Sequence, residues 1–344
     1  MKERLGRHPV HSFYSPPPDL GEFLRQNQHL LIASAIGSGL PDIRRRSAPD
    51  RLHSESSSFL ELFLASLYSG ALAPLTAGAR KQVVAGALAG ASEREARDVM
   101  DIWRRTLEAF LPTGSKTESA IFVNATMDRL SEVIVEQLRR WERRRIDIIV
   151  IGASAGGLGV LTDLMPQLDA ELPVTLVVVQ HLGRTGPSVL PAILARHSGM
   201  HIAPGMQGAP LYLGYAYIAT PNAHLTVERR RLALSDQPPE HFAKPSIDVL
   251  FRSAAQAFGR HLAAIILCGA GQDGADGIRV VHQMGGLTIA LSPEGLAYGA
   301  MPAAAIATGA VDHVIPELEL APFIRRLALN GRPPVRKLGA AIAR

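Results

Sequence analysis

The sequence predicts an α/β fold with a doubly wound, mostly parallel sheet, preceded by an all-α helical bundle. Before residue 146 apolar residues recur at helical spacing, and after it short apolar runs alternate with helical patterns. The alternation is typical of a Rossmann-like, three-layer sheet with helices on both faces. We expect a helical unit at residues 20–145 and an α/β unit at 146–330, between a disordered leader at 1–19 and a basic tail at 331–344.

The helical half contains five candidate helices. Two of them begin with the capping pattern Ser-x-x-Glu, at Ser92 and at Ser115. The helix that starts at Ser115 is expected to bury one apolar stripe, which consists of Ile121, Phe122, Ala125, Leu130, Val133, Ile134, Leu138 and Trp141. A flexible loop is expected at residues 40–50. The remaining candidate helices cover residues 20–36, 57–68 and 75–89.

Five apolar runs in the second half predict buried strands. They are "IDIIVIG", "VTLVVVQH", "LAAIILCG", "LTIALS" and "AVDHVIP". Continuous apolar runs of this length are typical of parallel strands that are covered on both faces. Residues 211–235 alternate in polarity and contain turn residues, so we expect them to add antiparallel hairpins to this sheet.

Composition limits the class of protein. The chain has 344 residues, a net charge of +5, and no apolar run of membrane-spanning length. The single cysteine, Cys268, excludes an internal disulfide, and no secretory signal opens the chain, so we expect a cytoplasmic protein. The basic cluster at 139–145 is compatible with nucleic acid or an acidic protein surface. The solvated end of a helix explains it better, and no nucleic-acid partner is expected.

The chemistry-bearing residues follow the ends of three predicted strands. In open parallel sheets these ends meet at one edge, and here they carry Ser154, His181 and Asp273. The segment 152–156 fits the pattern G-x-S-x-G, in which small neighbours leave a nucleophilic serine accessible. His181 would then act as the base and Asp273 would orient it. Backbone amides at the following helix start, near Ala155 and Gly156, would bind the oxyanion.

Two other interpretations of these residues are weaker. The dinucleotide fingerprint G-x-G-x-x-G is not met, because Ser154 stands at its second glycine. An acidic residue after the second strand is also missing, since Gln180 and His181 are there instead. The order Ser, His, Asp disfavours the α/β-hydrolase fold. His224 and Asp248 are further candidates for the same cleft, although surface or capping roles are commoner for such residues.

Residues 146–328 resemble the catalytic domain of CheB, the chemotaxis protein-glutamate methylesterase. The resemblance implies a triad of Ser154, His181 and Asp273 that hydrolyses γ-glutamyl methyl esters on a methylated chemoreceptor-type protein. It also implies glutamine deamidation in some members, and no metal or cofactor. The matching segments, in order, are "IGASAGG", "VVVQHL", "AYIATPNAHL", "PSIDVLFRSAA", "GAGQDGADGI" and "GAMPAAAIATGAVDHVIP".

The sequence departs from the family pattern in three places. Ala155 stands where threonine is commonest, and Ala270 stands where methionine is usual, which opens the expected substrate wall near Gln272 and His224. The first 145 residues lack the acidic pair and the alternating elements of a receiver domain. We therefore expect residues 20–145 to form a homodimer, dock a regulatory partner or gate the cleft. A regulatory scaffold and, less favoured, a nucleotide-binding protein remain the alternative functions.

Overall fold

The structure is a computed structural model of the chain. It describes residues 20–37, 59–61, 63–65, 93–111, 116–181 and 189–333. The expected leader at 1–19, the loop at 40–50, the helix at 75–89 and the tail beyond residue 333 lie outside the described residues. The chain divides into two compact units, Met1–Glu142 and Arg143–Arg344. No helix in the described ranges is long and apolar enough to cross a lipid bilayer.

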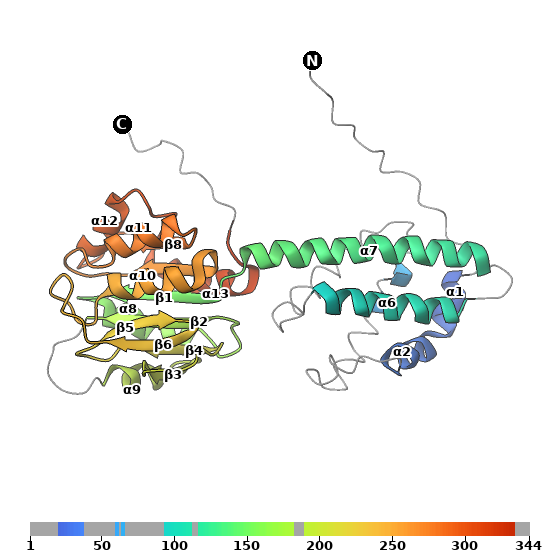
Figure 1. The fold of residues 1–344 in the computed structure, drawn as a ribbon, viewed down its shortest axis with the longest axis horizontal. Helices are drawn as coiled ribbons and strands as arrows, with labels where there is room; N and C mark the ends of the chain where they lie inside the picture. The colour runs from blue at the N-terminus through green and yellow to red at the C-terminus, as the bar shows by residue number, and fades with distance from the viewer. Residues whose placement is uncertain are drawn as a thin grey trace, which may run out of the picture. The chain divides into compact units, whose positions relative to one another are not determined.

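The described part of the first unit is helical, as the sequence predicts. Its helices are α1 (Leu20–Gln26), α2 (Gln28–Gly37), α6 (Glu93–Ala109) and α7 (Lys116–Arg144) (Figure 1). Their apolar faces form a core that includes Leu24, Phe63 and Met127. The rings of Phe59 and Trp103 lie 4.6 Å apart in this core. Such aromatic contacts add to the area that the helices bury against each other.

The buried face of α7 agrees in part with the expected one. Of the expected residues, Phe122, Leu130, Leu138 and Trp141 are buried, whereas Ile121 and Ala125 are exposed. Val123 and Met127, which the sequence analysis did not include, are also buried and lie on one stripe with Leu130, at i, i+4 and i+7. The sequence of α7 contains two overlapping apolar stripes, and contacts with the other helices, which the sequence pattern does not reveal, determine which one is buried.

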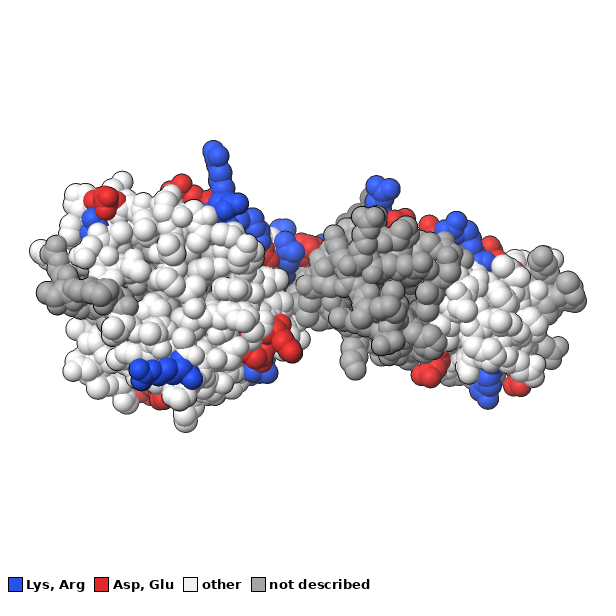
Figure 2. Space-filling view, turned by 90° about the horizontal axis from the view of Figure 1, so that it is seen from below, with Lys and Arg blue, Asp and Glu red and all other residues white. Residues whose placement is uncertain are grey.

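The basic cluster at the end of α7 contains ion pairs. Arg139 pairs with Glu93 at 2.8 Å, and Arg140 pairs with Glu136 at 2.9 Å. On the face of the molecule in Figure 2, Lys and Arg occur in separate small groups among uncharged residues. The paired arginines therefore favour the solvated end of a helix, as the sequence analysis expects.

The second unit is built on a seven-stranded parallel sheet, which confirms the predicted fold class. The strand order is β3-β4-β2-β1-β7-β8-β9. Strands β1, β2, β7 and β8 are buried along their whole length, which explains their continuous apolar sequences. The strands that the sequence predicts are β1 (Ile148–Ala153), β2 (Thr175–Gln180), β7 (Leu262–Ile266), β8 (Leu287–Leu291) and β9 (His313–Ile315).

Residues 211–235 only partly form the expected antiparallel hairpins. β4 (Tyr215–Ile218) instead joins the sheet as a parallel strand between β2 and β3 (His201–Pro204). β5 (His224–Glu228) and β6 (Arg231–Ser235) form one antiparallel hairpin. Strands of four residues are too short to show a reliable polarity pattern, so neither β3 nor the pairing of β4 was evident from the sequence.

Two helical layers cover the faces of the sheet (Figure 1). One face packs against α8 (Gly157–Leu164), α9 (Leu190–Ala195) and α13 (Leu320–Asn330). The other packs against α10 (Ile247–Phe258), α11 (Ala275–Gln283), α12 (Ala300–Ala307) and the β5–β6 hairpin. Short 3-10 helices lie at Met165–Gln167, Gly259–His261 and Glu317–Glu319. The strand order reverses at β1, so the carboxyl ends of β1, β2 and β7 border the position where such sheets bind their ligands.

Packing of α10 against β1 depends on a glycine. A Cβ at Gly152 would lie 2.4 Å from Cγ2 of Ile247, the first residue of α10. We expect Gly152→Ala to destabilise the fold by about 1–3 kcal/mol, because the helix must shift to accept it. Gly159→Ala is the matched control, since nothing lies within 4 Å of its Cβ position.

Alanine at position 159, which lies inside α8, should stabilise the chain by about 0.5–1 kcal/mol. Urea unfolding of both variants measures the two effects. Equal unfolding midpoints for Gly152→Ala and the wild type would show that α10 does not depend on this close approach.

Candidate active site

Ser154 lies on a tight turn between β1 and α8. Its backbone N–H donates to the carbonyl of Cys268 at 2.9 Å, which ties the turn to the strand end of β7. Gly156 has a φ of 80°, in the left-handed region that favours glycine. A Cβ at Gly156 would also lie 3.1 Å from the ring of Tyr298. The small residues around Ser154 therefore allow a sharp turn in a crowded place.

His181 follows β2 and is fixed to the same turn. Its backbone N–H donates to the carbonyl of Ala153 at 2.9 Å. The side-chain amide of Gln180 donates to the carbonyls of Ser154 and His181, at 2.7 and 2.9 Å. The sequence analysis noted Gln180 but gave it no role. A polar residue at the end of an otherwise apolar strand was the signal that could have identified it.

The three residues singled out in the sequence lie in one hydrogen-bonded chain. Oγ of Ser154 is 3.2 Å from Nδ1 of His181, and Nε2 of His181 is 2.8 Å from Oδ2 of Asp273. Because a carboxylate only accepts, the ring proton lies on Nε2 and is donated to Asp273. Nδ1 then carries the free lone pair, and it faces the hydroxyl of Ser154.

Asp273 is held at the N-terminus of α10. Its carboxylate accepts from the backbone amides of Ile247 and Asp248, at 2.8 and 3.0 Å, and from the hydroxyl of Ser246 at 2.9 Å. A helix N-terminus presents unpaired amides and a positive partial charge, both of which stabilise an anion. These donors hold Asp273 in the orientation in which Oδ2 meets His181.

The hydrogen bonds to Asp273 also determine its charge. Burial would raise the pKa of this carboxyl, but the bonds from His181 and from the Ile247 and Asp248 amides outweigh burial and lower the pKa to about 2. Asp273 is therefore a carboxylate at neutral pH. A fixed negative charge beside His181 stabilises the imidazolium that forms when this ring takes a proton.

His224 does not line the cleft, contrary to the expectation from the sequence. It is fully buried, and its Nδ1 accepts the backbone N–H of Ser246 at 3.1 Å. Its Nε2 donates to the carbonyl of Pro238 at 3.0 Å. His224 thus orients Ser246, which in turn binds Asp273. Its place at the start of the buried strand β5 explains why it faces inward.

A cleft of about 400 Å³ opens beside the Ser–His–Asp chain. Ala270 and Gln272, which the sequence analysis placed near the substrate, line it together with His181 and Asp273. The other wall consists of His241, Phe242, Ala243, Lys244 and Pro245, which the sequence analysis did not single out. They lie in a loop before α10, and only Pro245 belongs to a segment quoted in the sequence analysis, "PSIDVLFRSAA".

The backbone amides of Ala155 and Gly156 are available near Ser154. Within the described residues, neither donates to a backbone carbonyl, whereas the neighbouring amides of Ser154 and Gly157 do. Both follow the nucleophile directly, at the start of α8. Amides in this position are able to donate hydrogen bonds to a developing oxyanion.

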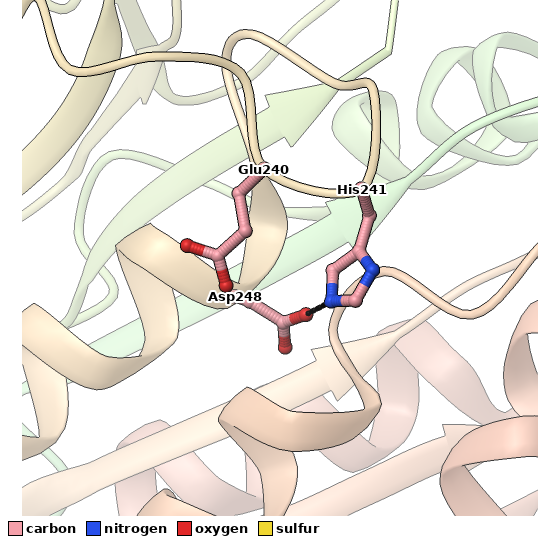
Figure 3. A group of neighbouring side chains, drawn as sticks. All are labelled: Glu240, His241 and Asp248. Atoms are coloured by element: carbon pink, nitrogen blue, oxygen red, sulfur yellow. Dashed lines mark ion pairs between the residues drawn. The ribbon is translucent and has the colours of Figure 1, made fainter.

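Glu240, His241 and Asp248 form a second cluster beside the cleft (Figure 3). Their potential ligand atoms lie within 4.8 Å of one another. Both oxygens of Glu240 already bind the guanidinium of Arg252, at 2.8 and 2.5 Å, and this positive charge opposes a bound cation. The cluster is therefore better described as an ion-pair network than as a metal site.

Asp248 is the member of this cluster whose ionised form is disfavoured by burial. Its carboxyl is fully buried, accepts the Gly277 amide through Oδ1, and has no hydrogen-bond donor for Oδ2, which lies 3.4 Å from Nε2 of His241. Burial, with the nearby charge of Asp273, raises the pKa of Asp248 to about 6. Asp248 and Asp273 thus lie at the same helix N-terminus with pKa values shifted in opposite directions.

Ser154, His181 and the buried carboxylate of Asp273 are hydrogen-bonded in that order. They lie at the carboxyl edge of a doubly wound sheet, where the strand order reverses. This is the arrangement of a serine hydrolase. The family model for CheB methylesterase matches residues 149–324. This chain belongs to the CheB methylesterase family.

Similar proteins match about half of the chain. The protein-glutamate methylesterase/protein-glutamine glutaminase 2 of Anaeromyxobacter dehalogenans is 37% identical over 183 residues, which are 53% of this chain and 54% of that protein. The corresponding protein 1 of Rhodospirillum rubrum is 36% identical over 200 residues, covering 56% and 51%. The chain thus spans about half the length of these two relatives.

A solved structure shares the fold of the second unit. The crystal structure of the Thermotoga maritima CheB methylesterase catalytic domain matches with a TM-score of 0.51 and 28% sequence identity. The match covers 53% of this chain and 98% of the Thermotoga chain. The match therefore extends over nearly the whole of that catalytic domain.

The buried carboxyl of Asp248 should make stability depend on pH. An acid whose pKa is raised on folding, here from 3.8 to about 6, stabilises the fold below pH 3.8, and this contribution is lost as the pH rises through 6. At pH 8 we expect the free energy of unfolding of Asp248→Asn to exceed that of the wild type by about 1–2 kcal/mol. Near pH 4 the two proteins should be equally stable.

Asp163→Asn, at an exposed position in α8, is the control and should leave the pH profile unchanged. Urea unfolding at both pH values provides the measurement. A lower stability of Asp248→Asn at pH 8 would show that the ionised carboxylate is stabilised by His241 rather than penalised by burial.

Proposed function

We propose that this chain is an esterase that hydrolyses glutamyl methyl esters on a chemoreceptor-type protein. The observation that carries the proposal is the chain of contacts from Ser154 through His181 to Asp273, at 3.2 and 2.8 Å. Family membership and the names of the relatives, which are protein-glutamate methylesterases, support the substrate class.

The first half of the reaction acylates Ser154. Its Oγ attacks the ester carbonyl while Nδ1 of His181 takes the hydroxyl proton. The negative oxygen of the tetrahedral intermediate is bound by the amides of Ala155 and Gly156. Nδ1 then returns the proton to the leaving methoxide, and methanol departs. The carboxylate of Asp273 stabilises the imidazolium throughout these steps.

The second half releases the product. Water attacks the acyl carbonyl, His181 accepts its proton through Nδ1, and the collapse of the intermediate returns this proton to Oγ of Ser154. The product is a glutamate side chain. A glutamine substrate would form the same acyl-enzyme with ammonia as the leaving group, which makes deamidation the accompanying activity that the relatives' names suggest.

The proposal predicts that activity depends on the hydroxyl of Ser154. We expect the full chain to release methanol from a methylated chemoreceptor fragment, and Ser154→Ala to lower the rate by at least about 10³-fold. Labelling of the enzyme with a fluorophosphonate tests the nucleophile without any assumption about the substrate. Wild type should be labelled at Ser154, and the alanine variant should not.

The two measurements distinguish the remaining interpretations. Labelling of Ser154 without methanol release would keep the serine hydrolase and reject the methylated receptor as substrate. The absence of both would favour the regulatory scaffold. Protection from thermal unfolding by NAD or ATP would instead support the nucleotide-binding alternative.

We further propose that residues 20–145 form a separate unit that dimerises the protein or docks a regulatory partner, ahead of a catalytic unit at 146–330. Leu30 of α2 and Ile121 of α7 are large apolar side chains that are about half exposed, which supports an interface on this unit. Analytical ultracentrifugation should give a dimer for the full chain and a monomer for residues 146–344. A monomer for the full chain as well as for residues 146–344 would rule out the dimer.

A further inference from the structure

Phe242 is a fully exposed aromatic residue at the mouth of the catalytic cleft. Its side chain is 101% exposed, the highest value among the exposed large apolar residues in the described ranges. It lines the same cleft as His181 and Asp273. A single exposed apolar side chain is common on protein surfaces, but this one lines the cleft that holds the Ser–His–Asp chain.

The turn that carries Phe242 is strained. The backbone amides and carbonyls of Glu240 and Ala243 exchange two hydrogen bonds, at 3.1 and 2.8 Å. Between them His241 has a φ of 49° and Phe242 a φ of 63°. Two successive left-handed residues are the pattern of a type I′ turn, for which Asn and Gly are strongly preferred. A His-Phe pair in this turn is a poor choice for local stability.

Two side-chain contacts anchor the turn to α10. Glu240 binds Arg252 through both carboxylate oxygens, at 2.8 and 2.5 Å. His241 points its Nε2 toward Asp248, 3.4 Å away (Figure 3). Both partners lie on α10, whose N-terminus also holds Asp273. The turn is thus fixed to the helix that positions the catalytic carboxylate, and Phe242 is held outward beside it.

Unfavourable backbone conformations that are held by surrounding contacts occur preferentially at functional sites. The occupant of the cleft reaches Phe242 only if it extends beyond the ester itself, because this ring points into solvent. A free methyl ester would remain next to Ser154. An ester on a folded protein brings neighbouring apolar side chains to the rim of the cleft.

We propose that Phe242 is a substrate-binding residue that packs against apolar side chains of the protein segment carrying the esterified glutamate. The inference rests on the proposed function and deepens it by naming a recognition residue outside the Ser–His–Asp chain. Tyr298, half-exposed and next to Gly156, provides a second aromatic surface near Ser154. The substrate segment therefore meets an aromatic residue near each end of the catalytic chain.

The test compares Phe242→Gly and Phe242→Ala with wild type. For methanol release from the methylated chemoreceptor fragment, we expect KM to rise about tenfold and kcat to change by less than about twofold, as for loss of one aromatic anchor. Fluorophosphonate labelling of Ser154 should keep its rate, because the probe carries no protein segment that could pack against Phe242. Leu318→Ala is the matched control, since Leu318 is 92% exposed and is absent from the cleft lining.

Thermal unfolding separates recognition from a structural role. Glycine accepts a positive φ without strain, so Phe242→Gly should unfold at the same or a higher temperature than wild type. A lower unfolding temperature together with slower labelling would assign Phe242 to the fold and overturn the inference. An unchanged KM, or an equal rise in KM for Leu318→Ala, would also overturn it.

The outcome also separates this inference from the proposed function. If wild type releases methanol and the Phe242 variants have an unchanged KM, the recognition role of Phe242 is rejected and the proposed function stands. If wild type is labelled at Ser154 but releases no methanol, the substrate assignment falls, and the inference falls with it.

Discussion

The carboxylate of Asp273 is bound at the N-terminus of α10, and the geometry of the candidate site depends on this contact. Two backbone amides, of Ile247 and Asp248, and the hydroxyl of Ser246 hold it in place. Together with the hydrogen bond from His181, the two amides keep Asp273 ionised despite its burial, with a pKa of about 2. The same oxygen that meets the Ile247 amide meets His181, so the start of the helix fixes the direction of the imidazole. Backbone amides are rigid donors, which suits them to hold a charge that must not move during a reaction.

The glycine-rich turn after β1 makes room for side chains rather than for a phosphate. Gly152 is small because Ile247 at the start of α10 approaches it closely. A Cβ at Gly157 would lie 2.4 Å from Oε1 of Gln180, whose amide holds the carbonyl of Ser154. The two glycines thus allow two side chains to approach the turn closely. Gln180 holds the carbonyl of Ser154, and Ile247 belongs to the helix start that binds Asp273. Phosphate-binding turns and nucleophile turns share small residues, and the neighbouring side chains distinguish them.

The sequence was sufficient to place Ser154, His181 and Asp273 together, because residues that follow parallel strands must meet at one sheet edge. It was not sufficient for their supports. The donor at Ile247 is a backbone amide, which every residue except proline provides, so the type of residue at this position does not indicate its role. Phe242 lies in a loop whose left-handed conformation contradicts the preferences of its residues, so local patterns could not indicate it. The buried face of α7 and the pairing of β4 depended on partners distant in sequence, for which periodicity carries no information.

The start of α10 contacts both Asp273 and the turn that carries Phe242. Asp273 accepts the first amides of this helix, while Asp248 and Arg252, one turn apart, bind the turn that presents Phe242. The burial of Asp248 opposes its ionisation, and its Oδ2 lies 3.4 Å from Nε2 of His241. Because one rigid helix end carries both sets of contacts, the turn cannot move relative to the catalytic carboxylate without breaking one of them. A protein substrate that packs against the turn is therefore placed at a fixed distance from His181, which is the condition for its ester to meet the nucleophile in a reactive orientation.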